Sequence, residues 1–415
     1  MKKHTKMNKS CKKVLIIAYA CEPNRTSEPG VGWHFTKEIS NSFNTIVLTR
    51  KNNKNAIEKV KNDKREFLYY DLPFFFKKLK KNLPLGTQLY YIIWQWGAYL
   101  YAKKLIENSN ISVDLLHHLN FGISWITPPA FLFKIPFIWG PIGGGDFIPL
   151  SFLKQMTYKS ILQESFYYIL NKFNKISFFS FLTRKKAKVI IFRTSSAKQA
   201  FPFNKDKLYS IISETAYSDI IPKIDKTHND YIHALCIGRM AYWKGFSLAV
   251  KGFHSFIQNG GKGKLELFGE GPELKKIKMY IKDNNLENYI FVRGFVINND
   301  IKNKLKEASI LLHPSFRDGG SWSIIESMSN GLPVICLNAS GPKDMVTDKG
   351  GLLIDVISPN QVVEDIGKGL LELLNDPIKY KTLSIYAQKR INTEYTWKKR
   401  GEQMKKVYED VLNKI

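Results

Sequence analysis

The stretch SILLHPSFRDGGSWSIIESMSNGLPVICLN, residues 309–338, decides the fold class because it holds one complete strand–loop–helix–strand unit. The apolar run ILLH predicts a buried strand, and the glycine pair after it predicts a loop. A helix is then expected over residues 323–330, and the run PVICLN predicts a second strand. A strand that leads through a helix into another strand is typical of a parallel sheet.

The same alternation extends over most of the chain. From residue 233 onward, short apolar strands are separated by helices, and an earlier series precedes them, with strands expected at residues 14–20, 45–49, 114–119 and 136–139 and a helix at 31–40. The 415 residues are enough for two hydrophobic cores. We therefore predict an α/β protein with two Rossmann-like domains facing a central cleft, because ligands of such sheets bind beyond the carboxyl ends of the strands. The predicted segments are a first domain at 1–212, a linker at 213–230, a second domain at 231–394 and an amphipathic helix at 395–415.

Composition narrows the class further. A hydrophobic fraction of 44% and a charged fraction of 24% are those of a globular protein. The net charge of +27 indicates an anionic partner, such as nucleic acid, a nucleotide sugar or an acidic membrane surface, although a lysine-rich composition accounts for part of it. Cys11, Cys21, Cys236 and Cys336 lack the spacing of a metal site or a disulfide framework. The apolar run at 14–20 after a basic stretch imitates a signal peptide, but its shortness and the glycine loop after it favour a buried strand. No segment approaches the roughly 18 apolar residues of a membrane span, so we expect a cytoplasmic protein.

Two loops after predicted strands carry features of phosphate sites. In PGVGW, Gly30 and Gly32 would let main-chain N–H groups approach a ligand at the start of a helix, or they would simply form a turn. In GRMAYWKG, Arg239 and Lys244 follow the first strand of the second series, and two cations there could bind a diphosphate from two sides. The alternative for the second loop is a solvated basic surface.

The loop at residues 318–323 adds two carboxylates. Asp318 lies in the predicted loop over the cleft, and Glu326 lies eight residues later in the predicted helix. Loop N–H groups and the helix dipole can bind a phosphate or sugar hydroxyls, and a glutamate in the same cleft can accept both hydroxyls of a ribose. Either residue alone could also be structural, with Asp318 stabilising a turn and Glu326 favouring the start of a helix.

Together these motifs resemble the retaining GT-B glycosyltransferases of family 4, the group 1 glycosyltransferases. The resemblance rests on GR-x4-K, GEGPE, VRGF, the stretch from residue 313 to 335 and SGPKDMV, and it extends over nearly the whole chain. It implies that the last helix packs back on the first domain, that Glu326 binds the ribose of a nucleotide, and that Arg239 and Lys244 bind its diphosphate. It also implies that the loop after Asp318 receives the donor sugar through Gly319, Gly320, Ser321, Trp322 and Ser323. The spacing of the family's Glu-x7-Glu signature is kept, with Asp318 at the first position.

The family also has a catalytic-site histidine near the end of a middle strand of the first domain. DLLHHLNFG offers His117 and His118, and alternation along a strand places them on opposite faces. We select His118, with Asn120 on its side, as the residue that faces the cleft. A purely structural histidine is the alternative. WGPIGGGD, residues 139–146, predicts close backbone approach to a ligand or to the facing domain.

The resemblance implies transfer of a hexose-type sugar, with retention, from a nucleoside-diphosphate sugar to a hydroxyl of a lipid-linked or polysaccharide acceptor in cell-surface polysaccharide biosynthesis. No metal or other cofactor and no nucleic-acid partner are expected. Aromatic and basic residues alternate at 74–81 and 158–188, which indicates peripheral contact with the anionic inner face of the cell membrane or, alternatively, an ordinary helix pair. Two competing hypotheses for the function are a sugar-nucleotide epimerase of the same architecture and a non-enzymatic protein that binds anionic surfaces.

Overall fold

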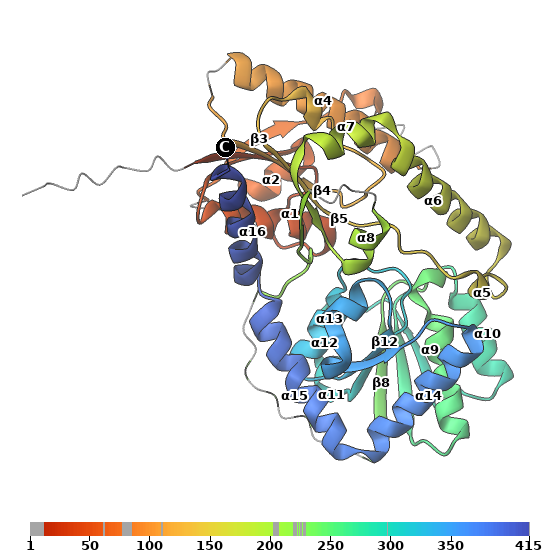
Figure 1. The fold of residues 1–415 in the computed structure, drawn as a ribbon. Coiled ribbons are helices and arrows are strands. Elements are labelled where there is room, and N and C mark those ends of the chain that lie inside the picture. Colours follow the sequence, from red (N-terminus) through yellow and green to blue (C-terminus); the bar gives the residue numbers. More distant parts are fainter. Residues whose placement is uncertain are drawn as a thin grey trace, which may run out of the picture.

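The computed structural model describes residues 12–60, 63–76, 85–108, 111–201, 207–218, 222, 224, 226, 230–296 and 298–414. It contains two parallel sheets, one in each of two domains (Figure 1). The first sheet has the strand order β3-β2-β1-β4-β5-β6-β7, and the second has the order β10-β9-β8-β11-β12-β13. The predicted fold class of two Rossmann-like domains is confirmed.

The first domain is built on a central strand, β1, whose apolar run is buried on both faces, as expected for a parallel sheet covered by helices. β1 pairs with β2 and β4, with Val14 opposite Thr45 on one side and Leu115 on the other. The strands are β1 (Lys13–Ala18), β2 (Asn44–Arg50), β3 (Glu66–Tyr70), β4 (Leu115–Asn120), β5 (Phe137–Ile142), β6 (Ala187–Phe192) and β7 (Leu208–Ile211). The main helices are α1 (Ser27–Ser40), α4 (Gly86–Asn108), α5 (Leu150–Leu153), α6 (Tyr158–Ile176), α7 (Phe178–Lys186) and α8 (Ser195–Ala200).

The second domain repeats the strand–helix alternation. Its strands are β8 (Ile232–Ile237), β9 (Gly263–Phe268), β10 (Ile290–Gly294), β11 (Ile310–His313), β12 (Val334–Leu337) and β13 (Gly351–Ile354). Its helices are α9 (Phe246–Gln258), α10 (Leu274–Asp283), α11 (Asn298–Glu307), α12 (Trp322–Ser329), α13 (Ser340–Gly350), α14 (Pro359–Asn375) and α15 (Pro377–Glu394). Gly252 allows α9 and α14 to pack closely, because a Cβ atom there would lie 2.4 Å from the Ile366 side chain.

The C-terminal helix α16 (Trp397–Leu412) crosses back to the first domain, as predicted, and lies beside α1 (Figure 1). The crossing is fixed where the main-chain N–H of Tyr217 donates to Tyr395 O at 2.7 Å. Tyr408 then packs against Phe43 and is hydrogen-bonded with His117 Nδ1 at 2.5 Å. The two domains are therefore joined by two neighbouring chain segments.

The start of α1 differs from the sequence-based expectation, and two other predicted segments are described only in part. α1 begins at Ser27 rather than at residue 31, so Gly30 and Gly32 lie inside its first turns and not in a loop before it. Parts of the predicted linker 213–230 and residues 77–81 of the predicted aromatic–basic stretch 74–81 lie outside the described residues. The second aromatic–basic stretch, 158–188, forms the helix pair α6 and α7 and reaches the start of β6.

Candidate active site

A cavity of about 720 Å³ lies between the two domains at the carboxyl ends of their strands. Its walls come from loops after β4 and β5, from α6, and from the loops after β8, β9 and β11. The lining includes Trp125, Gly144 and Tyr167 of the first domain and Arg239, Trp243 and Arg317 of the second. The structure thus has a cleft where the sequence predicts one.

Lys244 and Asp318, 74 residues apart in sequence, form an ion pair with 2.6 Å between Lys244 Nζ and Asp318 Oδ2. They meet because β8 and β11 are adjacent parallel strands, so that the loops after them lie side by side. His313 Nε2 lies 3.0 Å from the same carboxylate oxygen. Burial alone would raise the pKa of Asp318, but the charge of Lys244 and the hydrogen bonds from His313 and Lys244 hold it well below its usual range. Asp318 is therefore a charged group at neutral pH.

Arg239 is exposed and lines the cavity wall. Its loop is held against the GEGPE loop, because Met240 N–H donates to Glu270 O and Glu273 N–H donates to Met240 O, each at 2.9 Å. Gly269 permits this approach: its φ is +128°, and a Cβ atom there would lie 1.9 Å from Gly238 O. The two predicted diphosphate cations thus differ in environment, since Lys244 has a carboxylate partner and Arg239 faces the open cavity.

The glycine pair after Asp318 lies at the contact between the domains. A Cβ atom on Gly319 would lie 2.2 Å from Arg193 Nε, and one on Gly320 would lie 2.7 Å from Thr215 Oγ1. The hydroxyls of Ser321 and Ser323, which flank the start of α12, are 2.9 Å apart. Both glycines are therefore required by close packing of this loop against the first domain.

Trp322 and Ser323, the last two residues of the loop predicted to receive the donor sugar, lie on α12 together with Glu326. The Trp322 ring is 6.4 Å from the ring of Trp397 on α16, centroid to centroid. Glu326 is half-buried, and burial raises its pKa, partly offset by the charge of Lys302. Within the part of the chain that the structure describes, the Glu326 carboxylate has no hydrogen-bond or ion-pair partner, so it is available to a ligand.

The two histidines of β4 point to opposite faces of the sheet, as alternation predicts, but the selection of His118 as the residue facing the cleft is wrong. His118 is 2% exposed, and its Nε2 and Nδ1 lie 2.8 and 3.3 Å from the hydroxyls of Tyr91 and Tyr99 on α4. Burial lowers the pKa of His118 to about 3. His117 is enclosed by α16 on the other face. The side-chain amide of Asn120 donates to Ala20 O at 2.7 Å, whereas its main-chain oxygen accepts from the Tyr91 hydroxyl, which also contacts His118 Nε2.

Gly30 and Gly32 are buried where α1 meets the end of β1. A Cβ atom on Gly30 would lie 2.1 Å from Arg25 O, and one on Gly32 would lie 2.0 Å from Ala20 O. Both glycines let the first turns of α1 pack against the loop before it. Their predicted contact with a phosphate remains a prediction.

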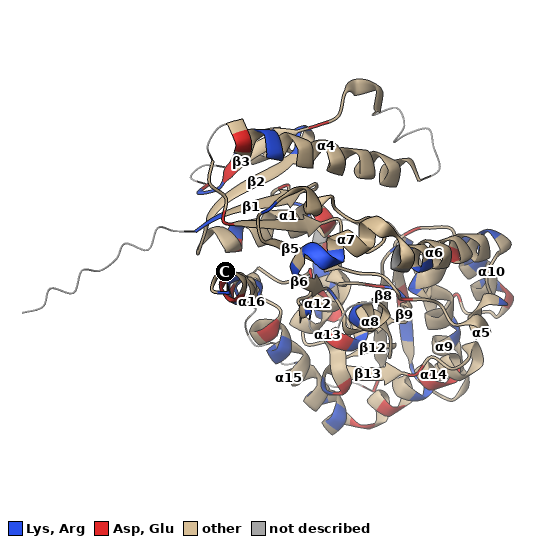
Figure 2. Ribbon diagram, turned by 45° about the horizontal axis from the view of Figure 1, so that its top comes forward, with Lys and Arg blue, Asp and Glu red and all other residues tan. Residues whose placement is uncertain are grey.

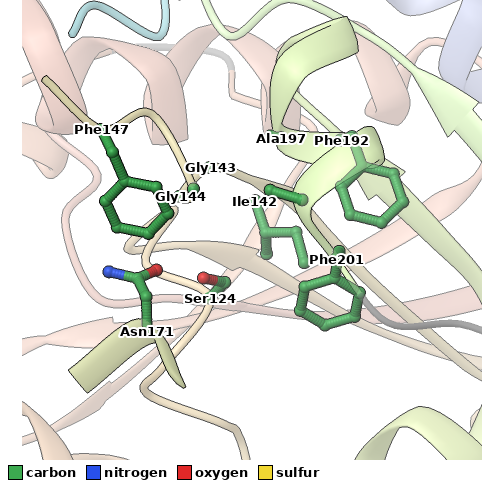
Figure 3. Close-up of a pocket in the computed structure, with 11 residues that line it drawn as sticks. Ser124, Ile142, Gly143, Gly144, Phe147, Asn171, Phe192, Ala197 and Phe201 are labelled. Atoms are coloured by element: carbon green, nitrogen blue, oxygen red, sulfur yellow. The ribbon is translucent and has the colours of Figure 1, made fainter. Parts of the chain in front are cut away.

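The triple-glycine loop after β5 packs directly on side chains of the first domain. A Cβ atom on Gly144, whose φ is +137°, would lie 2.4 Å from Ser124 Oγ and 3.0 Å from Asn171 Oδ1. Figure 3 shows these two side chains beside the loop, at a small cavity of about 20 Å³ that has mostly apolar walls. The loop therefore approaches side chains of the first domain closely, and its Gly143 and Gly144 also line the interdomain cavity.

Sequence reasoning missed a group of charged residues at the base of the cleft. Arg193 follows β6 and pairs with Glu214 at 3.0 Å, and Glu28 lies close enough to both to interact with them electrostatically. Burial and the neighbouring charge of Glu214 raise the pKa of Glu28 to about 7. The sequence pattern did not reveal β6, which follows the basic end of α7, so Arg193 could not be placed at the end of a strand. No three His, Cys, Asp or Glu side chains of the described ranges are grouped so that they could hold a metal ion.

Comparison with known proteins places a recognised sequence family over much of the second domain. The family model of group 1 glycosyl transferases matches residues 218–390. The poly(glycerol-phosphate) alpha-glucosyltransferase of Bacillus subtilis is 29% identical over 170 residues, which cover 40% of this chain and 24% of that protein. The first curated relatives are matched over 24–48% of their own lengths.

Solved structures share the whole architecture. Anabaena HepE in complex with UDP and glucose superposes with a TM-score of 0.59 at 16% identity and covers 96% of this chain and 100% of that one. Staphylococcus aureus TarM in complex with fondaparinux, alpha-GlcNAc-glycerol and UDP superposes with a TM-score of 0.60 at 15% identity and covers 97% and 100%. The two domains and the returning helix α16 therefore form the GT-B fold.

Proposed function

We propose that this protein is a retaining glycosyltransferase that moves a hexose-type sugar from a nucleoside-diphosphate sugar to a hydroxyl of a lipid-linked or polysaccharide acceptor, in cell-surface polysaccharide biosynthesis. The observation that carries the proposal is the ion pair of Lys244 and Asp318 within the segment that matches group 1 glycosyl transferases, next to Trp243 and Arg317, which line the interdomain cavity. An epimerase of the same architecture would need no acceptor, and a protein that only binds anionic surfaces would not need Glu326.

On the donor side, Lys244 and Arg239 supply positive charge for the diphosphate that leaves. Charge that develops on the departing phosphate oxygen is stabilised best by donors already fixed in place, and the contact with Asp318 fixes Lys244. Glu326 accepts the ribose hydroxyls through its carboxylate. Retention follows when the acceptor hydroxyl attacks from the face of the sugar that the diphosphate leaves, with its proton passing to the leaving phosphate. Two cations at this point supply the charge that a metal ion supplies in other transferases, so we expect no metal requirement.

On the acceptor side, the cavity combines rings and polar groups. Trp125 and Tyr167 line it from the first domain and Trp243 from the second, with Gln88 and Gln163 nearby in the lining. Flat aromatic faces pack against the apolar faces of sugar rings, while amides bind hydroxyl groups. This lining favours a glycan as the part of the acceptor that enters the cavity.

The outer surface of α6 supports contact with a membrane. Six apolar residues at helical spacing are 44–80% exposed along the helix: Tyr158, Leu162, Phe166, Ile169, Phe173 and Ile176. In residues 147–192 the sequence has eight lysines and arginines and one acidic residue, Glu164, and Lys and Arg are drawn blue in Figure 2. An exposed apolar stripe among cations suits the headgroup region of an anionic bilayer. No helix among the described residues is long and apolar enough to cross a membrane.

A transfer assay tests the proposed function. The protein is incubated with UDP-, GDP- and ADP-sugars and a lipid-linked glycan fraction, beginning with UDP-sugars because HepE and TarM were crystallised with UDP. We expect labelled sugar in the acceptor fraction, and we expect Lys244→Ala to abolish it. Lys282→Ala, which removes an exposed lysine of α10, is the matched control. Sugar-nucleotide conversion without an acceptor would instead favour the epimerase.

A further inference from the structure

Arg317 belongs to the second domain, but its guanidinium group contacts the first. Its Nη2 lies 2.5 and 2.6 Å from the two carboxylate oxygens of Glu164 on α6. Its Nε donates a hydrogen bond to the main-chain oxygen of Asp146, at 3.0 Å, at the end of the triple-glycine loop. One side chain of the loop after β11 therefore binds two separate segments of the first domain.

The contact is shielded from water. The side chains of Arg317 and Glu164 are 18% and 8% exposed, and the guanidinium lies 3.8 Å from the ring centroid of Tyr167. The hydroxyl of Tyr242 also donates to Glu164 Oε2, at 3.2 Å, so two side chains of the second domain hold this carboxylate. An ion pair with little exposure keeps much more of its attraction than a surface pair does. It is thus a specific link across the cleft rather than a passing surface contact.

The residues on either side of Arg317 extend the link into the donor site. Phe316 packs against Phe152 of α5, with 4.8 Å between ring centroids. Asp318 carries the carboxylate that binds Lys244. Three consecutive residues are therefore fixed in turn by α5, by α6 and by the proposed diphosphate cation, so a shift of α6 would move the backbone that places Asp318.

α6 is also the helix that meets the acceptor side. Gln163 and Tyr167 line the cavity, and so does Phe166 of the exposed apolar stripe, so the stripe borders the cavity. Glu164, next to Gln163 in the chain, is the single acidic residue in positions 147–192. It is therefore the one carboxylate side chain that this segment offers to Arg317.

We propose that Arg317 is a positioning residue, and that its ion pair with Glu164 transmits the position of α6 to Asp318 and so couples acceptor engagement to sugar transfer. This inference rests on the proposed function. The guanidinium of Arg317 is engaged by Glu164 and by Asp146 O, so its effect should appear in turnover and not in the binding of free nucleotide.

A double-mutant cycle tests the link. Glu164→Gln and Arg317→Gln should each lower the turnover number for transfer by at least about tenfold, while the Kd for UDP stays within threefold of wild type. The double variant should be no slower than the slower single variant, because both remove one interaction. The exchanged pair Glu164→Arg with Arg317→Glu should recover part of the loss. Glu409→Gln, which removes an exposed pair with Lys405 on α16, is the control and should have no effect.

Multiplicative losses in the double variant, or a weakening of UDP binding equal to the loss of turnover, would overturn the inference. A wild-type protein that transfers no sugar would refute the proposed function. In that case the contact between Arg317 and Glu164 is tested by a distance measurement between the two domains alone. Spin labels on Lys104→Cys and Lys368→Cys, exposed positions of α4 and α14, report the separation of the domains in the full chain with Cys11→Ser. The link predicts a broader distance distribution in Glu164→Gln than in wild type, and an unchanged distribution contradicts it.

Discussion

Replacing Asp318 with asparagine should strengthen the binding of free UDP while it slows sugar transfer. In the structure the carboxylate of Asp318 takes up the charge of Lys244, at 2.6 Å, and the depressed pKa of Asp318 keeps that carboxylate ionised at neutral pH. A diphosphate that binds Lys244 must therefore approach a second negative charge. Asparagine removes this charge and keeps an oxygen near His313 Nε2.

The magnitude follows from the geometry. Two unit charges about 5 Å apart at an effective dielectric constant of about 20 repel by about 3 kcal/mol. Screening by salt and by Lys244 itself reduces the net effect, and we expect about 1–2 kcal/mol, which corresponds to UDP binding that is about 5- to 30-fold tighter.

Isothermal titration of UDP into wild type and Asp318→Asn at pH 7.5 measures this difference. Asp283→Asn, which removes an exposed carboxylate at the end of α10, controls for the change in net charge. Transfer should fall because Lys244 loses the carboxylate that fixes it in place. Weaker UDP binding by Asp318→Asn would refute the reasoning, since the loss of a fixed Lys244 would then outweigh the relief of charge repulsion.

Three further predictions follow from the same geometry. Burial raises the pKa of Glu326, so its charged form destabilises the native state above the unfolded-state pKa of about 4.3. Glu326→Gln should therefore raise the melting temperature at pH 8 by on the order of 1–2 °C, with no gain near pH 4, and it should weaken UDP binding. A lower melting temperature at pH 8 would contradict this prediction. Transfer should be unchanged in the presence of EDTA, because in the proposed site Lys244 and Arg239 supply the charge for the diphosphate, and a loss that Mg²⁺ or Mn²⁺ restores would show a metal requirement. The double variant Ile169→Ser with Phe173→Ser should lower sedimentation with phosphatidylglycerol vesicles at low salt by at least about tenfold. The control Ile378→Ser, which changes a residue of the second domain that is 80% exposed, should not lower it. Equal binding of the wild type to neutral vesicles would argue against an anionic membrane as the partner.

The sequence predicted the second domain better than the first. Strands β8 to β12 are short apolar runs bounded by glycine, proline or polar residues, so their positions are visible from pattern alone. The helix α4 was missed because apolar residues surround it on all sides, as in YYIIWQWGAYLY, and no amphipathic period marks it. The start of α1 was placed too late because Pro29 and Gly30 suggest a loop, although proline is tolerated in the first turn of a helix.

The residues of the candidate site likewise divide into those that the sequence pattern could place and those that it could not. Lys244 and Asp318 could be placed in one cleft from sequence because both follow predicted strands of one sheet, although their ion pair was not predicted. The partners of His118 are tyrosines of α4, so missing that helix also hid the burial of the histidine. Arg317 and Glu164 are 153 residues apart and lie in different domains, and no local pattern relates them. Contacts between domains depend on their relative placement, which sequence periodicity does not encode.

The anomeric configuration of the transferred sugar tests the central claim most directly. One-dimensional proton NMR of the product formed from an α-linked nucleoside-diphosphate hexose gives the coupling constant at the anomeric carbon's proton. A retaining transferase predicts the small coupling of an α-linked gluco- or galacto-configured product. The large coupling of a β-linked product would contradict retention, and an unchanged acceptor with a converted sugar nucleotide would contradict transfer itself.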